Sequence, residues 1–217
     1  MIEPDSDAAA GTESRRRILK GAALTPVLLS LASRPVLGQE CTISGMMSGN
    51  TSNHGAGHDC GGLSPGAWKT ADAGAGDWSR TPCKPGTLKA SSEKNTFSLA
   101  SRNGRDKGKS PYDKDGTLFF AYPDSFRGRD PHYAGKTLME VLWMNGKDDP
   151  HKFGAHIVAA LLNAYAIPDY GMTPTDVQEL YENVERHGGP TGSGYVSDTG
   201  KMLSVRQVVY FIQQTFG

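Results

Sequence analysis

The segment that most constrains the fold of this chain covers residues 152–165 and reads Lys-Phe-Gly-Ala-His-Ile-Val-Ala-Ala-Leu-Leu-Asn-Ala-Tyr. Drawn as a helix, it carries apolar residues on most of its surface, which is typical of a helix that is buried nearly all round. Its alanines leave room for neighbouring helices to approach closely. Ile167 followed by Pro168 ends it. The segment therefore predicts a central helix that other helices surround.

Three further helices are predicted around this one. Residues 136–144 place Leu138, Val141 and Leu142 on one face of the first. The other two helices begin at Thr173 and Ser204, and each start has a recognisable cap. Thr173 is followed by proline, which suits a first helical turn, and Ser204 has a glutamine three residues later as a capping-box partner.

The N-terminal half of the chain has a different composition. Residues 39–116 are rich in Gly, Ser, Asn, Asp and Lys and contain few apolar runs, which is typical of loops. We expect Trp68, Trp78 and Phe97 to dock this half onto the helices. The segment 118–122 is either a short strand or a buried extended stretch.

These patterns together predict a mainly α fold. We expect a small bundle of about four helices, with an irregular, Gly-rich, disulfide-pinned N-terminal half packed on it. The predicted parts are a leader at residues 1–38, a loop-rich segment at residues 39–116 and a helical domain at residues 117–217.

The three cysteines can supply the predicted disulfide. Cys41, Cys60 and Cys83 allow one disulfide in an oxidising compartment. We favour Cys41–Cys60, which closes a short glycine-rich loop that cannot fold by burial alone. Cys60–Cys83 is the competing pairing.

An export signal is predicted near the N-terminus. Arg15 and Arg16 stand in the run Ser-Arg-Arg-Arg-Ile-Leu-Lys, and a short apolar segment follows at residues 21–32. This pattern is typical of a twin-arginine signal, whose translocase carries proteins that fold before they cross the membrane. We expect cleavage before Gln39 and a periplasmic or extracellular location. The alternative is an amphipathic N-terminal helix of the folded domain.

Charge and hydropathy exclude two classes of partner. The chain has 23 basic and 23 acidic residues, so nothing in it predicts an electrostatic surface for nucleic acid. The apolar segment of the leader is shorter than the stretch of about 20 residues that spans a bilayer. We therefore expect no stable membrane span after cleavage.

The sharpest candidate for chemistry is a possible metal site at His54, His58 and Asp59, next to Cys60. Imidazole and carboxylate groups together can bind zinc or copper. The glycines between the two histidines argue against a helix that would hold both rings on one face. The competing interpretation is a solvated loop without a cofactor.

A second candidate lies on the central helix. His156 and Asn163 are seven residues apart, so they share one side of it, two turns apart. If they formed a catalytic pocket, His156 would be the natural general base of a hydrolase. A histidine on a core helix is more often a structural residue. We find no nucleophile-elbow serine and no Cys–His signature.

Four segments of the chain together resemble those of a known group of proteins: residues 41–50, 60–69, 137–142 and 156–164. Their order resembles a group of exported bacterial proteins for which no reaction is established. These proteins carry a Cys-x-x-x-[Ser/Thr]-Pro-Gly-[Tyr/Phe]-Trp-Lys-type motif and a later His-x-x-Ala-Ala-Leu-Leu-Asn-Ala helix. The resemblance implies export and a shared fold, and it implies no activity. The chain departs from the pattern at Ala67, where an aromatic residue is usual, and after Lys69, where a histidine often stands.

The expected function is therefore a non-enzymatic structural or interaction role at the cell envelope or outside the cell. Expected partners are the twin-arginine translocase during export and an envelope protein afterwards. A metal-binding or metal-dependent protein using His54 and His58 is the alternative, and a hydrolase around His156 and Asn163 ranks third.

Overall fold

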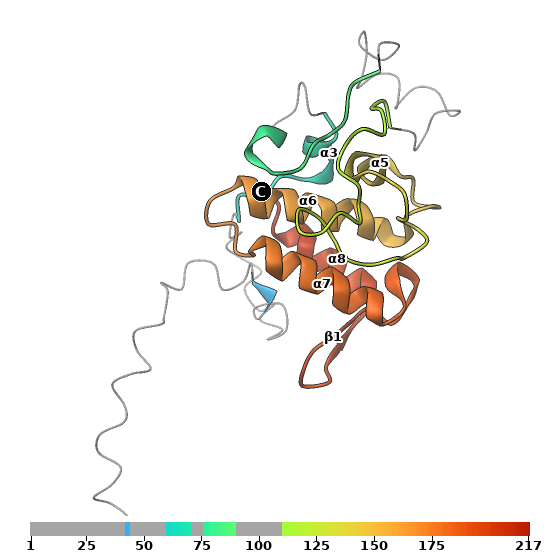
Figure 1. Cartoon of the computed structure of the whole chain (residues 1–217). Helices are drawn as coiled ribbons and strands as arrows, with labels where there is room; N and C mark the ends of the chain where they lie inside the picture. The colour runs from blue at the N-terminus through green and yellow to red at the C-terminus, as the bar shows by residue number, and fades with distance from the viewer. Residues whose placement is uncertain (1–41, 44–59, 71–75, 90–109) are drawn as a thin grey trace, which may run out of the picture. The chain divides into compact units, whose positions relative to one another are not determined.

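The computed structural model describes residues 42–43, 60–70, 76–89 and 110–217 (Figure 1). The chain divides into two units, Met1–Leu37 and Gly38–Gly217, and every described residue belongs to the second. The predicted leader with Arg15 and Arg16 lies outside the described residues.

The core of the second unit is built around helix α6 (Phe153–Ala166). From Phe153 to Asn163 every residue of this helix except His156 is buried. Four helices pack against it, as Figure 1 shows: α3 (Pro65–Trp68), α5 (Leu138–Trp143), α7 (Pro174–Arg186) and α8 (Val205–Gln214). The prediction of a central buried helix is confirmed, because apolar side chains all round α6 can be buried only when other elements cover it on several sides.

The predicted helix starts are also confirmed. The side chains of Thr173 and Ser204 each accept a hydrogen bond from a backbone N–H at the third helical position, and the residue there bonds back to the cap. These capping boxes satisfy N–H groups that have no partner within the helix. Thr137 and Glu140 form a third capping box at the start of α5.

Helix α5 is shorter than predicted. It ends at Trp143, because Met144 has an extended backbone with ψ 143°. At 14 residues, α6 is longer than α7 and α8. None of the described helices is long and apolar enough to cross a membrane.

An aromatic cluster fills the space between α6, α7 and the segment that precedes α5. Phe119 is completely buried and is the cluster's centre. Its ring lies within 4.6 Å of the rings of Phe126 and Tyr133 and within 5.2 Å of that of Tyr181, measured between centroids. Leu118 forms an isolated antiparallel bridge with Thr137, but a bend at Phe119 and Phe120 and a turn at Tyr122 follow it. The segment 118–122 is therefore neither a strand of a sheet nor a buried extended stretch.

A small hairpin connects α7 to α8. Strands β1 (Tyr195–Val196) and β2 (Met202–Leu203) pair antiparallel, and the Asn183 side chain of α7 hydrogen-bonds both the N–H and the carbonyl of Val196. Sequence analysis missed this hairpin because two-residue strands are too short to show an alternating pattern.

The predicted fold class is therefore wrong in two respects. The described residues contain five α-helices rather than about four, and two of them are short, with four residues in α3 and six in α5. They also contain the two-stranded sheet of the hairpin.

The predicted disulfide pin involves three cysteines, of which the structure describes Cys60 and Cys83. Cys60 is disulfide-bonded, whereas Cys83 is free and buried, which excludes the Cys60–Cys83 pairing; Cys41, the partner that we favoured, lies outside the described part of the chain. Buried aromatic side chains also attach the described pieces of the N-terminal half to the core, above all Trp68, Trp78 and Tyr112. Apolar burial of such large side chains stabilises this attachment.

Candidate functional site

Two of the segments that carry the family resemblance, residues 60–69 and 156–164, contact each other at Asn163. The Asn163 Oδ1 atom accepts hydrogen bonds from the Leu63 backbone N–H and from the Trp68 indole N–H, both at 2.9 Å. Its Nδ2 atom donates to the Leu63 carbonyl, also at 2.9 Å. Asn163 and Trp68 are both completely buried. The amide of Asn163 thus binds the segment around α3 to the central helix.

Gly62 allows this close approach. A Cβ atom at this position would collide with the Thr215 carbonyl oxygen and would lie 2.7 Å from the Tyr170 ring and 3.0 Å from Asn163 Nδ2. Any larger residue would therefore push the segment away from the helix.

His156 lies half-buried on the same helix, but its partners differ from those of Asn163. Its Nδ1 atom is 2.7 Å from the Lys152 carbonyl oxygen, and its Nε2 atom is 3.0 Å from Gln213 Nε2. A carbonyl accepts and an amide NH₂ donates, so these contacts require a neutral ring protonated on Nδ1. The ring also stacks on Phe216, with centroids 5.9 Å apart. Burial is the main cause that lowers the pKa of His156.

The predicted pair of His156 and Asn163 is therefore not assembled into one polar pocket in the described structure. Asn163 binds Leu63 and Trp68, and both ring nitrogens of His156 are engaged elsewhere. A general base needs a ring nitrogen that can reach a substrate proton. In the arrangement described, the Gln213 amide occupies that nitrogen.

The turn before α6 has an unusual backbone. His151 and Lys152 both have positive φ, 57° and 60°. Consecutive non-glycine residues in this region are uncommon and persist only where surrounding contacts hold them. Here Asp149 and Lys152 make such contacts.

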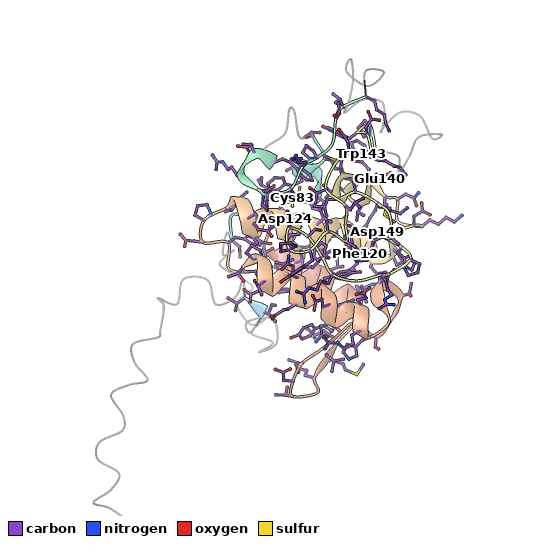
Figure 2. The ribbon with its side chains drawn as sticks, in the orientation of Figure 1. Cys83, Phe120, Asp124, Glu140, Trp143 and Asp149 are labelled. Atoms are coloured by element: carbon purple, nitrogen blue, oxygen red, sulfur yellow. The ribbon has the colours of Figure 1, made fainter. Side chains whose placement is uncertain are left out.

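Asp149 caps α6 from inside the core (Figure 2). Its carboxylate accepts hydrogen bonds from the N–H groups of Gly154 and Ala155, at 2.8 and 3.0 Å, and from the Tyr133 hydroxyl at 2.9 Å. The residue is completely buried. Burial raises its pKa, whereas the donated hydrogen bonds act in the opposite direction.

Lys152 connects the end of α5 to the start of α6, because its ammonium donates to the Met144 carbonyl. A cation at this position also complements the negative end of the α5 dipole. The Lys152 backbone carbonyl accepts a hydrogen bond from the His156 ring, so Lys152 holds both the end of α5 and the His156 side chain of α6.

Lys69 completes a group that we call the basic cluster, defined as Lys69, Lys152 and His156. It directly follows α3, and its ammonium lies over the Trp143 ring, 5.5 Å from the centroid. Burial is the main cause that lowers the pKa of Lys69, and the charge of Lys152 lowers it further. Both lysines also lower the pKa of His156, which agrees with the convergence of the three side chains.

A buried donor without an acceptor lies beside the basic cluster. No carboxylate among the described residues lies within ion-pair distance of Lys69. The indole N–H of Trp143, a residue labelled in Figure 2, is buried without a hydrogen-bond acceptor in the described structure. The basic cluster is our candidate functional site, because it gathers ionisable side chains whose pKa values are lowered.

The predicted metal ligands His54, His58 and Asp59 lie outside the described residues, as does Cys41. Within the described ranges, no group of three or more His, Cys, Asp or Glu residues is arranged to hold a metal ion.

Sequence reasoning missed the basic cluster and did not single out Asp149. A signal for Asp149 was present, because an aspartate followed by proline is a typical helix start. No local pattern marks the approach of Lys69 to Trp143, since these residues are far apart in the chain.

Comparison with known protein families, with curated proteins and with solved structures finds no match to this chain.

Proposed function

We propose that this chain is exported by the twin-arginine route and serves as a non-enzymatic structural or interaction protein at the cell envelope or outside the cell. The proposal rests on the paired Arg15 and Arg16 and on one structural observation. Trp68 and Asn163 are the most specific residues of two segments that carry the resemblance, 60–69 and 156–164. Their side chains hydrogen-bond each other in the core. Their presence is thus explained by folding, without a catalytic role.

The same contact supports the proposed route. Trp68 and Asn163 are separated by 95 positions in the chain, so their hydrogen bond forms only after both segments have been synthesised and packed. A domain built on contacts of this range suits a translocase that accepts folded proteins.

Cell fractionation tests the proposal. We expect the double variant Arg15→Lys/Arg16→Lys to stay inside the inner membrane, because the paired arginines address the chain to its translocase. The matched control is Arg17→Lys/Arg34→Lys, which makes the same exchange outside the pair and leaves export intact. Undiminished delivery of the Arg15/Arg16 variant would contradict the proposal.

A further inference from the structure

The turn between α5 and α6 contains an asparagine followed by a glycine, Asn145 and Gly146. This dipeptide is typical of turns. It is also the pair in which the main-chain nitrogen most easily attacks the preceding asparagine side chain, because glycine has no β-carbon to crowd that approach. Asn145 is half-buried and Gly146 is exposed, so water reaches the pair.

The attacking nitrogen of this pair is not engaged in the described structure. None of the hydrogen bonds among the described residues uses the Gly146 N–H. The turn is held instead by the Asn145 carbonyl, which accepts from the N–H groups of Asp148 and Asp149 at 3.2 and 3.0 Å. Reaction at the Gly146 nitrogen therefore breaks no hydrogen bond of the described turn.

The Asn145 side chain is held in a position that favours the attack. Its Oδ1 atom accepts from the N–H groups of Lys147 and Asp148, at 2.8 and 3.2 Å, and its Nδ2 atom donates to Asp148 Oδ2 at 2.6 Å. The ring of atoms that the Lys147 bond closes contains the Gly146 nitrogen, so the amide carbon is folded back toward that nitrogen. The same two N–H groups face the oxygen that becomes negative during the attack, as in an oxyanion hole.

We propose that Asn145 is a site of spontaneous deamidation and isomerisation in the folded protein. The Gly146 nitrogen gives its proton to water and bonds to Cγ of Asn145; the Cγ–Nδ2 bond breaks, and Nδ2 takes a proton from water and leaves as ammonia. Water then opens the cyclic imide at either carbonyl. One opening gives aspartate, and the other gives isoaspartate, in which the main chain continues through the former side chain. The reaction consumes water alone and goes beyond the proposed role of the exported protein.

Both products alter the turn that leads to α6. Each puts a negative charge at residue 145, whose Nδ2 atom donates to the Asp148 carboxylate before the reaction. Two carboxylates at this separation repel each other. Isoaspartate also lengthens the main chain and turns the carbonyl that accepts from Asp148 and Asp149 into a free carboxylate. We therefore expect conversion to loosen this turn and to lower the melting midpoint.

Peptide mapping by mass spectrometry of the purified full-length chain tests the site. During incubation at mildly alkaline pH, well below the melting midpoint, we expect Asn145 to convert progressively to aspartate and isoaspartate. Gly146→Ala is the matched variant, because a Cβ atom there meets only Lys152 Cε at 3.9 Å, an ordinary contact. We expect it to slow conversion by about tenfold or more, since the added methyl group crowds the attacking nitrogen.

Two further measurements place the reaction in the folded turn. Asn163→Ala removes a core contact outside the turn, so the conversion rate at Asn145 should equal that of the wild-type chain. A reaction through transient unfolding would instead speed up with the unfolded population. The melting midpoint should fall during incubation of the wild-type chain and stay higher in Gly146→Ala. The second Asn-Gly pair, at residues 103 and 104, is present in both proteins and does not affect this comparison.

The outcomes separate clearly. Conversion at Asn145 that Gly146→Ala suppresses and Asn163→Ala leaves unchanged supports the proposal. An intact Asn145, equal conversion in Gly146→Ala and the wild-type chain, or faster conversion in Asn163→Ala would overturn it. Equal loss of the melting midpoint in the wild-type chain and Gly146→Ala would overturn the effect assigned to the turn. Because every measurement uses purified protein, none of these results bears on export.

Discussion

His156 shows how contacts determine the protonation state of a single residue. Gln213 donates to one ring nitrogen and the Lys152 carbonyl accepts from the other, so the neutral ring fits its surroundings. Protonation would place an N–H on Nε2 facing the Gln213 amide NH₂, and two donors cannot hydrogen-bond each other. Lys69 and Lys152 oppose the positive charge, and Asp149 favours it.

A pH dependence of stability follows. The pKa of His156 is lowered in the folded state, so the unfolded chain binds its proton first as the pH falls. We expect the free energy of unfolding to decrease below about pH 6.5, the ordinary histidine value, as the pH approaches the lowered pKa. Chemical denaturation across this range measures the effect. His156→Gln should flatten this part of the profile; equal slopes in the wild-type chain and His156→Gln would contradict the expectation.

At the scale of the element, α6 shows which properties of a helix are local. Its extent follows from the apolar residues at 153–166, and most of it is buried as predicted. The start of α6 depends on more distant residues. Across the turn at His151 and Lys152, Asp149 accepts hydrogen bonds from the N–H groups of Gly154 and Ala155. Asp149 also accepts one from the Tyr133 hydroxyl. The carboxylate thus joins the helix start to the aromatic cluster.

We expect Asp149→Ala to destabilise the protein by about 3 kcal/mol or more, because it leaves three donors without their acceptor in the core. Thermal and urea denaturation measure the loss. Asp148→Ala is the matched control, since Asp148 is exposed and accepts from Asn145 in the same turn. Its expected cost is below about 1 kcal/mol. A similar small cost for Asp149→Ala would show that water replaces the carboxylate.

At the scale of the whole molecule, one buried side chain joins the two halves of the described chain. Asn163 hydrogen-bonds the segment around α3, and burial of Trp68 and Trp78 strengthens the attachment. The indole N–H of Trp78 donates to the Trp68 carbonyl at 3.0 Å, so the second tryptophan depends on the first.

We therefore expect Asn163→Ala to cost about 2–4 kcal/mol, because the buried Trp68 indole and Leu63 amide lose their partner. Denaturation followed by tryptophan fluorescence measures the stability, and the emission reports on the environments of the three tryptophans together. Gln214→Ala on the exposed side of α8 serves as the control. An unchanged denaturation midpoint for Asn163→Ala would contradict the structural role assigned to this amide.

Sequence alone determined the elements whose signals are local. The buried helix at 153–166 and the caps at Thr173 and Ser204 depend on residues within a few positions of one another, and such patterns survive in any tertiary arrangement.

Only the tertiary structure decided the hairpin, the attachment through Asn163 and the basic cluster. Each of these depends on groups far apart in the chain: Asn183 with Val196, Leu63 with Asn163, and Lys69 with Trp143. No periodicity in one segment specifies which distant segment will cover it. The choice is made by the packing of buried surface and by the need to pair buried polar groups, which act only when the whole chain is folded.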